Sequence, residues 1–273
     1  MPKVSIVLPT YNGHQFINRA IGSVFEQTYV DWELIIIDDG SSPAIDATIE
    51  KKYLDDSRVR VLKNEKNLRI QKTLNRGLKE SKGEYVARLD DDDWWNCKDK
   101  LQRQVEFLDS NPDIGVVGTG AIIIDKVGNE LFKYELATKD SEIRRKILKK
   151  NPYIHASVMF RKDLVVKLGG YSESEETLHL EDYDLWLRVG GHAKFAGINH
   201  NCTSFLLDSG GISSQNKKEQ LSKNTKLIKK YGKNYPGYSK YLIFSYIRNV
   251  LYVFYNLMPK IIKVRIFSIY KRG

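Results

Sequence analysis

The sequence predicts an α/β fold built on a mostly parallel sheet. Over the first 95 residues, short apolar runs that fit strands alternate with stretches whose apolar residues recur at helical spacing. The continuous apolar run at Trp32–Ile37 is typical of a strand buried on both faces, as in a parallel sheet. With 273 residues, 41% of them hydrophobic, the chain is long enough for one large domain with an appendage.

Strands and helices are expected in a regular order along the first part of the chain. The predicted elements are a strand at 3–8, a helix at 14–27, a strand at 32–37, a helix at 44–54, a strand at 58–62, a helix at 70–81 and a strand at 84–89. This alternation predicts helices on both faces of a parallel sheet.

The second part of the chain is predicted to continue the same sheet with more irregular connections. A helix is expected at about 98–110, a β-branched strand at 114–124, a second strand after a turn at Gly128, a helix at 141–149, a strand at 155–160, a short helix ending at Gly169 and Gly170, and a helix at 181–189. We therefore predict one domain over 1–215, with a regular half at 1–95 and a less regular half at 96–215, followed by a helical extension at 216–273.

The positive charge of the chain is confined to that extension. The net charge is +10, but 217–273 holds 14 Lys and Arg against one acid, Glu219, together with 11 of the 30 aromatic residues. The run Tyr241–Met258 is mostly apolar yet carries Arg248 and two asparagines, which argues against a membrane span. We expect 217–273 to contact an anionic membrane surface; the alternative is a pair of helices packed on the domain with a solvated basic face. Nucleic acid is not expected as a partner, because no recognised binding motif accompanies the charge.

The two cysteines give little information about the compartment. Cys97 and Cys202 are far apart in the sequence and lack the spacing of metal ligands, so neither a disulfide scaffold nor a zinc site is expected. They fit a reducing compartment. The apolar run at the N-terminus is too short for a signal peptide and is predicted to be the first strand.

Four consecutive aspartates, Asp90–Asp93, follow the predicted strand at 84–89. Adjacent carboxylates repel one another, so each resists ionising beside its neighbours. Two interpretations account for four adjacent carboxylates. They form a solvated turn that also caps a helix near Cys97, or they bind a hard divalent cation that neutralises their charge. The position after a strand of an open α/β sheet favours the cation, because ligands bind outside the carboxyl ends of such strands.

Two further loops are predicted to meet the aspartates. Pro9–Asn12 follows the first strand and Asp38–Ser42 follows the second. Taken alone, Asp-Gly-Ser is a weak turn signal, and Asp39 fits a helix-entry cap. Because the carboxyl ends of parallel strands share one edge, all three loops are expected to line one crevice.

Six segments of the chain form a pattern in order and spacing: Pro9–Asn12, Asp38–Ser42, Asn67 with Asn75–Gly77, Gly83–Tyr85, Leu89–Asp93 and Glu181–Arg188. Together they resemble glycosyltransferase family 2, whose members have a GT-A fold and are mostly inverting. The resemblance covers about residues 3–213. It implies a single Rossmann-like GT-A domain with a mostly parallel mixed sheet, and it leaves the basic helical extension outside. It also implies that 1–95 is the nucleotide-binding half and 96–215 the acceptor-binding half.

The resemblance also implies site residues. Asp39 would accept a hydrogen bond from the base of a nucleotide diphosphate sugar, between Pro9 and Tyr11. Asp92 would ligate Mg²⁺ or Mn²⁺ at the diphosphate, and Asp182 would be the catalytic base. Asp93 is either the further aspartate often seen in the family or only a helix cap. The implied nucleotide-binding residues are Pro9, Tyr11, Asn12, Asp39, Arg69, Asp90 and Asp91.

These roles agree with the chemistry of an inverting transfer. One carboxylate must take the proton of the acceptor hydroxyl, and a metal acting as a Lewis acid must neutralise the leaving diphosphate. Glu181 and Asp182 also have a purely structural interpretation. They stand at the start of a predicted helix, where the helix dipole stabilises acidic side chains.

The chain departs from the family pattern at two places. Asn67-Leu68-Arg69 replaces the common Asn-X-Gly. Where relatives often have an Arg and a His near the diphosphate, this chain has 205–208, so that Asp208, Lys217 or Lys218 would have to supply contacts. Candidate acceptor or diphosphate contacts are His155, Glu181, Trp186, Arg188 and Asp208. Trp186 fits a core position better than an acceptor platform, and His155 fits a structural or an acceptor-pocket role equally well.

The expected function is therefore an inverting glycosyltransferase. It would move a sugar, most simply from a UDP-sugar, to a hydroxyl of a glycan or lipid-linked oligosaccharide in surface polysaccharide synthesis, working on the cytoplasmic face of the cell membrane as a peripheral protein. The alternatives are a non-catalytic nucleotide- or metal-binding relative and a sugar nucleotidyltransferase. The Gly-rich phosphate loop usual for a nucleotidyltransferase does not follow the first strand.

Overall fold

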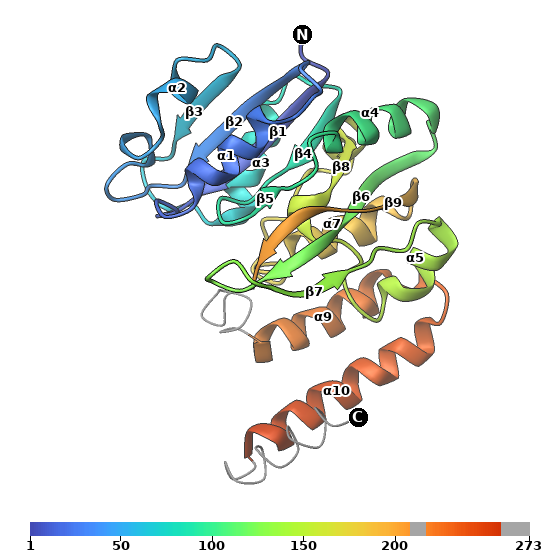
Figure 1. The fold of residues 1–273 in the computed structure, drawn as a ribbon. Helices are drawn as coiled ribbons and strands as arrows, with labels where there is room; N and C mark the ends of the chain where they lie inside the picture. The colour runs from blue at the N-terminus through green and yellow to red at the C-terminus, as the bar shows by residue number, and fades with distance from the viewer. Residues whose placement is uncertain (208–216, 258–273) are drawn as a thin grey trace.

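The fold is a layered α/β domain with a helical arm, here in a computed structural model that describes residues 1–207 and 217–257 (Figure 1). The strands are β1 (Val4–Thr10), β2 (Trp32–Asp38), β3 (Val59–Lys63), β4 (Tyr85–Arg88), β5 (Trp94–Trp95), β6 (Ile114–Ile124), β7 (Glu130–Tyr134), β8 (Met159–Arg161) and β9 (Lys194–Leu206). The helices are α1 (Ile17–Phe25), α2 (Lys51–Leu54), α3 (Ile70–Glu80), α4 (Lys100–Ser110), α5 (Asp140–Ile147), α6 (Lys162–Lys167), α7 (Glu181–Val189), α9 (Lys217–Tyr231) and α10 (Tyr238–Leu257). Three short 3₁₀ turns are η1 (Ile45–Ala47), η2 (His155–Ser157) and η3 (Gly232–Asn234).

One mixed sheet runs through the domain in the order β3-β2-β1-β4-β8-β6-β9-β5, with β7 paired to β6. The strands β3, β2, β1 and β4 are parallel, as predicted for the first part of the chain. Strand β8 is antiparallel to both β4 and β6, and β9 returns parallel to β6. The predicted continuation of one sheet is therefore confirmed, although parallel pairing is less general in the second half than we expected.

The apolar strands of the first half are buried as their composition predicts. Every residue of β1 and β2 is buried, and α1 and α3 each present an apolar stripe to the sheet. The core lies on both faces of the sheet, with Val4, Ile6 and Leu8 on one side and Val7, Ile35 and Ile37 on the other. This rigid layer carries the loops at the carboxyl ends of β1, β2 and β4.

The structure corrects the predicted elements in three places. The strand expected at 155–160 begins only at Met159, because 155–157 form the turn η2. The helix expected at 44–54 is broken into η1 and α2, because Glu50 between them has a non-helical backbone with ψ of 133°. Asp38 starts η1, since its carboxylate accepts the N–H of Ile45 at 3.0 Å. Strands β5 and β9 were not predicted. Strand β9 mixes polar and apolar residues without alternation, and it becomes a strand because it pairs with β6 along most of its length.

Cys97 and Cys202 form a disulfide, with their Cα atoms 4.8 Å apart. This corrects the expectation drawn from their separation of 105 residues. The pairing of β5 with β9 brings the two cysteines together, since Asn96 N–H donates to the Cys202 carbonyl at 3.1 Å. The two cysteines therefore no longer support a reducing compartment.

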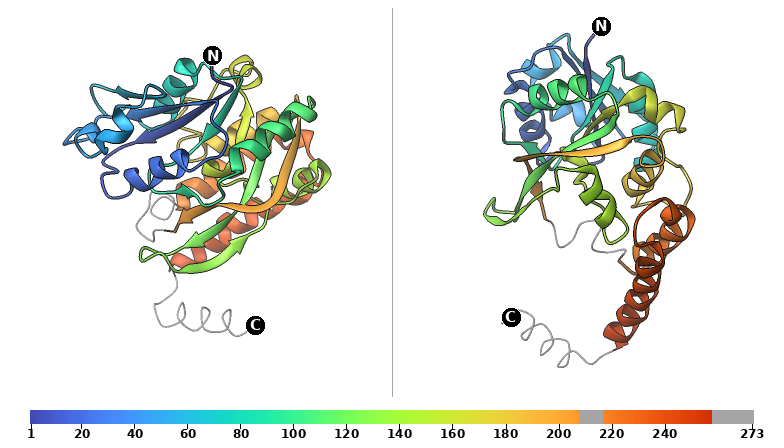
Figure 2. Two further views of the ribbon diagram at one scale, coloured as in Figure 1. Left: turned by 45° about the horizontal axis from the view of Figure 1, so that its top comes forward. Right: turned by 90° about the vertical axis from the view of Figure 1, so that its right-hand side faces the viewer.

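The C-terminal arm packs on the domain through α9. Leu227 and Ile228 are buried in the core beside α7, and the Tyr235 hydroxyl donates to the Leu187 carbonyl at 2.9 Å. Helix α10 lies along the outer side of α9 and extends away from the sheet (Figure 2). Within the described ranges, the structure contains no helix with the length and apolar character needed to cross a membrane. Helix α9 thus packs on the domain, as the alternative of two packed helices requires.

Candidate functional site

The loops after β1, β2 and β4 meet, as predicted, at one edge of the sheet. The Thr10 hydroxyl donates to Asp91 Oδ2 at 2.5 Å, and Asp39 N–H donates to the Thr10 carbonyl at 2.8 Å. Asn12 N–H donates to the Ser41 hydroxyl at 2.8 Å. The three motifs are therefore joined by direct hydrogen bonds.

Two glycines make this close approach possible. A Cβ on Gly13 would lie 1.9 Å from Asp91 Oδ2, so only glycine leaves room for that carboxylate. Gly40 has a φ of +81°, and a Cβ there would lie 2.7 Å from the backbone of Lys66. Both glycines are thus required by the contact between loops.

The two aspartates after β2 have different tasks. Asp38 is a structural residue, because its carboxylate accepts the N–H groups of Ser41 and Ile45 at 2.9 and 3.0 Å. Asp39 Oδ1 accepts from Asn64 Nδ2 at 2.6 Å and from Leu68 N–H at 2.9 Å, which holds the loop at 64–68 against β2. Its contact with a nucleobase stays a prediction.

The other predicted nucleotide-binding residues differ in exposure. Tyr11 is 52% exposed, whereas Pro9 is buried within β1 opposite Ile37. Of the two residues expected to flank the base, only Tyr11 offers a free surface. Arg69 has a left-handed backbone with φ of 71°, and its exposed guanidinium forms an ion pair with Glu175.

The four aspartates of 90–93 point to different partners. Asp90 Oδ1 accepts from Arg88 at 2.6 Å, Asp91 accepts from Thr10, and Asp93 Oδ1 accepts from Leu206 N–H at 3.0 Å. Burial raises the pKa of Asp91 to about 6 and that of Asp93 well above its usual range, Asp93 being raised further by the neighbouring Asp92. A protonated Asp93 lowers the repulsion among the other three carboxylates.

Asp93 does not cap the next helix. Helix α4 begins only at Lys100, with Asp99 before it, and the Asp93 side chain is 1% exposed beneath β9. Its second oxygen, Oδ2, is buried without a hydrogen-bond partner among the described residues. This corrects the simple capping interpretation.

The donor set fits a divalent cation held jointly with a substrate. Among the described residues, the one group of three possible ligands within 4.8 Å of one another is Cys97, Asp99 and Cys202, whose thiols are consumed by the disulfide. The aspartates thus do not build a closed cage. Mg²⁺ and Mn²⁺ suit carboxylate oxygens, and Mg²⁺ is commonly held by one or two carboxylates plus substrate phosphates and water. Asp92, with Asp91 beside it, provides that number of oxygens.

Arg88 is a site residue that the sequence reasoning missed. It is 0% exposed and donates to the carbonyls of Val7 and Leu89, to Asp90 and to His155. A buried guanidinium needs such partners, and here its ion pair with Asp90 fixes the position of that carboxylate. The sequence feature that could have revealed Arg88 is its charge within an otherwise apolar strand, two positions before the aspartates.

His155 belongs to the same buried network. Its Nε2 lies 3.2 Å from Arg88 Nε and 2.9 Å from the Tyr171 hydroxyl. Burial, and then the charge of Arg88, hold its pKa well below the usual range, so the ring is neutral and accepts at Nε2. Of the two roles left open, the structure supports the structural one.

Two predicted contact residues are turned away from any substrate. Trp186 is 0% exposed and packs edge-on against Tyr153, with ring centres 5.7 Å apart, so it is a core residue. Arg188 forms an ion pair with Asp184 at 2.8 Å and donates to the carbonyls of Leu168 and Gly170. The structure therefore excludes both as acceptor or diphosphate contacts.

Asp182 and Glu181 begin helix α7. Asp182 Oδ2 accepts from Asn151 Nδ2 at 2.6 Å, and Oδ1 accepts from Tyr183 N–H at 2.7 Å. Burial raises the pKa of Asp182 to about 6, although these two hydrogen bonds oppose the rise. Glu181 lacks such support at Oε2, which is buried without a partner among the described residues, and burial raises its pKa to about 8.

Near neutral pH, Glu181 is therefore the acid of this pair and Asp182 is the base. Asp182 is the ionised member, because Asn151 and the backbone stabilise its carboxylate, and Glu181 keeps its proton. Asp90 is near enough to raise the pKa of both, so α7 and the aspartates share one electrostatic environment. Asn151 was not predicted, since it lies 31 residues away in the sequence.

One predicted contact residue cannot be placed. Asp208 lies outside the described residues. A cavity of about 430 Å³ lies between α9 and α10, away from these carboxylates. The candidate active site is thus identified by its side chains and not by a cavity.

Comparisons with known proteins agree with this arrangement. Residues 5–169 match the family described as Glycosyl transferase family 2. EpsE of Bacillus subtilis (strain 168), described as a glycosyltransferase, is 34% identical over 189 residues, which are 68% of this chain and 66% of EpsE. WfgD of Escherichia coli, a UDP-Glc:alpha-D-GlcNAc-diphosphoundecaprenol beta-1,3-glucosyltransferase, is 29% identical over 246 residues, which are 89% of this chain and 92% of WfgD.

A solved structure shows the same fold at low sequence identity. The mannosyltransferase PcManGT from Pyrobaculum calidifontis, in complex with GDP-Man and Mn²⁺, superposes with a TM-score of 0.66 at 16% identity. The superposition covers 89% of this chain and 68% of PcManGT.

Proposed function

Because this chain belongs to glycosyltransferase family 2 and has the GT-A fold, we propose that it is an inverting, metal-dependent glycosyltransferase acting on a nucleoside diphosphate sugar. The observation that carries the proposal is the support of the Asp182 carboxylate by Asn151 and by Tyr183 N–H, next to Glu181, whose buried Oε2 has no partner among the described residues. This arrangement supplies a base on one side of a charged diphosphate site.

Asp182 would take the proton of the acceptor hydroxyl as its oxygen attacks the anomeric carbon. The new carbon–oxygen bond forms while the bond to the diphosphate breaks, and the leaving group departs with its electron pair. A base with a pKa of about 6 is ionised at neutral pH and still accepts a proton readily. Asn151 orients that carboxylate by its hydrogen bond at 2.6 Å.

The aspartates would bind the leaving diphosphate. Asp92, with Asp91, would hold Mg²⁺ or Mn²⁺, and the bound ion would neutralise charge on the leaving diphosphate. Arg88 orients Asp90 by a hydrogen bond at 2.6 Å, and Asp90 would face the ribose or the water around the metal. PcManGT, which shares the fold, is described with Mn²⁺ and GDP-Man, which supports this assignment.

We propose a UDP-sugar as donor and a lipid-linked oligosaccharide hydroxyl as acceptor, in surface polysaccharide synthesis. The support is WfgD, whose name gives UDP-Glc as donor and a diphosphoundecaprenol-linked sugar as acceptor. Because such an acceptor would lie in a membrane, we propose that the enzyme works as a peripheral protein at the cytoplasmic face of the cell membrane.

A non-catalytic binding protein is the second candidate. It is favoured by the segment 205–208 at the end of β9, where relatives often carry an Arg and a His near the diphosphate and this chain carries neither. Both candidates are expected to bind a nucleotide sugar, but only the glycosyltransferase would turn it over.

A donor screen tests the proposal directly. UDP-, dTDP- and GDP-sugars are mixed with the protein and Mg²⁺, and NMR follows binding by ligand line broadening and hydrolysis of the anomeric bond. We expect UDP-sugars to bind and to hydrolyse slowly, and Asp92→Asn to weaken binding at limiting metal. Binding without hydrolysis or transfer by the wild type would favour the non-catalytic candidate, and absence of binding by all donors would refute both.

A further inference from the structure

Helix α10 carries a broad apolar face on the outside of the molecule. Eight large apolar side chains, each 44–61% exposed, occupy one side of the helix: Ile243, Phe244, Tyr246, Ile247, Val250, Leu251, Val253 and Phe254. At 3.6 residues per turn they cover about half of the circumference. An exposed apolar patch of this size marks a surface that contacts a partner or a membrane.

The polar residues of α10 face the protein instead. Ser245 is 1% exposed, Asn249 Nδ2 donates to the Thr225 hydroxyl at 2.8 Å, and Arg248 donates to Asn224 Oδ1 at 2.5 Å. A helix on the surface of a soluble domain has the opposite arrangement, with its apolar side inward. The polar side of α10 packs against α9, and the apolar side of α10 therefore has no partner among the described residues.

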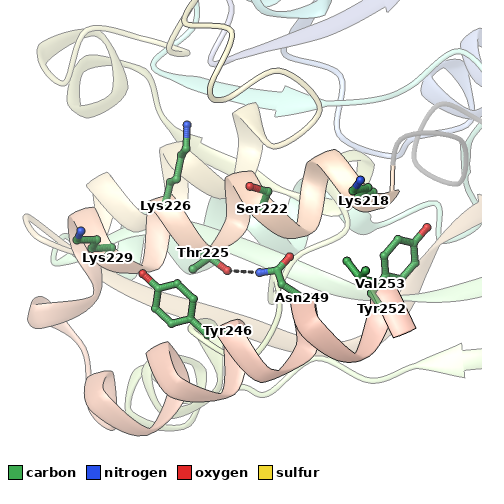
Figure 3. Close-up of a pocket in the computed structure, with 9 residues that line it drawn as sticks. All are labelled: Lys218, Ser222, Thr225, Lys226, Lys229, Tyr246, Asn249, Tyr252 and Val253. Atoms are coloured by element: carbon green, nitrogen blue, oxygen red, sulfur yellow. Dashed lines mark hydrogen bonds between the residues drawn. The ribbon is translucent and has the colours of Figure 1, made fainter. Parts of the chain in front are cut away.

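A basic groove borders the apolar face. The cavity of about 430 Å³ between α9 and α10 is lined on the α9 side by Lys218, Lys226 and Lys229, as Figure 3 shows. Tyr246 and Val253 belong both to this groove and to the apolar face. Lys226 also forms an ion pair with Glu176 at 2.8 Å. Cationic and apolar groups therefore lie side by side along one edge of α10.

Charge decides between the possible occupants of the face. Residues 217–257 hold nine Lys and Arg against Glu219 alone, and the sequence of 258–273 adds five more without an acid. A second copy of the chain would bring two strongly basic arms together, and their repulsion opposes such a dimer. Anionic lipids attract the same charges while the bilayer interface takes up the apolar side chains.

We propose that α10 lies in the interface of a membrane that contains anionic phospholipids, with its apolar face among the acyl chains and the lysines of the groove on lipid phosphates. Burial of the apolar face in the bilayer favours binding to any membrane, and the lysines of the groove favour membranes with anionic headgroups. This surface is separate from the carboxylate site, so the proposal concerns how the enzyme reaches an acceptor and does not depend on the chemistry proposed above.

Vesicle flotation with the full chain tests this proposal. The vesicles are pure phosphatidylcholine or phosphatidylcholine with phosphatidylglycerol. We expect the wild type to bind the anionic vesicles and to lose affinity with rising salt. The double variant Ile247→Asp with Leu251→Asp should bind at least about tenfold more weakly, because it places two charges in the apolar interface.

Two matched variants separate the two parts of the surface. Lys218→Gln and Lys229→Gln should each weaken binding to anionic vesicles about fivefold and reduce the salt dependence. Val30→Asp changes an apolar side chain that is 70% exposed elsewhere on the domain and should leave binding unchanged. Circular dichroism and thermal unfolding establish that each variant is folded.

Three results would overturn the proposal. They are absence of flotation by the wild type, equal loss with Val30→Asp, and a dimer seen by light scattering that the α10 variant dissolves while no vesicles bind. The last result would mean that a second copy covers the face. Donor hydrolysis without vesicles is measured in parallel, so that loss of membrane binding with retained hydrolysis is distinguished from failure of the proposed function.

Discussion

Replacing Asp182 by Asn removes a negative charge and a proton acceptor while it keeps the shape of the side chain. Asn retains one oxygen for Tyr183 N–H, and its amide nitrogen then faces Asn151, so the hydrogen bond at 2.6 Å is lost. A positioned general base contributes about 10²–10⁴-fold to the rate. We therefore expect kcat to fall by about that factor, with binding of UDP and metal retained.

The same change is expected to stabilise the fold at neutral pH. A carboxyl pKa raised from 3.8 to about 6 corresponds to at most about 3 kcal/mol against the ionised form. The residue is partly exposed, and the lost hydrogen bond costs about 1 kcal/mol, so we expect a net gain of about 1 kcal/mol at pH 7.

The sign of this effect depends on pH in a defined way. The folded-state pKa of Asp182 lies above its ordinary value, so its contribution to wild-type stability is full below pH 3.8 and is lost as the pH rises through about 6. The advantage of the variant should therefore appear above pH 6 and vanish at pH 4. Thermal unfolding at both pH values measures it.

Steady-state kinetics and calorimetric titration with UDP complete the assay. Glu181→Gln is the matched control, because it neutralises the adjacent carboxyl, which already keeps its proton near neutral pH. It should change kcat far less than Asp182→Asn. A kcat of Asp182→Asn within about threefold of wild type would refute the role of Asp182 as base, since a general base contributes more than that.

Further predictions concern the pH profile, the buried arginine, the glycine contact and the metal. We expect kcat/KM to fall about tenfold per pH unit below pH 6, where Asp182 takes up a proton, and the Asp182→Asn variant to lack this limb in a pH–rate profile. Arg88→Met should lower the free energy of unfolding by about 3–5 kcal/mol in urea titrations, because it leaves Asp90 without its cation. Unchanged stability would show that this ion pair is dispensable. Gly13→Ala should weaken donor binding in calorimetry, since its Cβ would displace Asp91, while circular dichroism stays that of the wild type. EDTA should abolish transfer, and added Mn²⁺ should restore it; transfer that survives EDTA would contradict metal dependence.

The positions of the loops around the donor site follow from local pattern. Strands β1, β2 and β4 are apolar runs that end at polar motifs, and parallel strands bring their carboxyl ends to one edge. The direct contacts between Thr10 and Asp91, and between Asn12 and Ser41, are what that rule predicts. Strand β9 escaped prediction because its residues lack alternation and acquire strand structure only by pairing with β6.

The sequence by itself determined the fold class, the family and the order of the carboxylates, because local periodicity and motif spacing encode them. Only the tertiary structure decided which carboxylate of α7 keeps its proton, because Asn151 reaches Asp182 from 31 residues away. The same holds for α10. Its composition shows an apolar helix, but only packing on α9 determines which side faces outward, since hydrogen bonds to Thr225 and Asn224 turn the polar side inward.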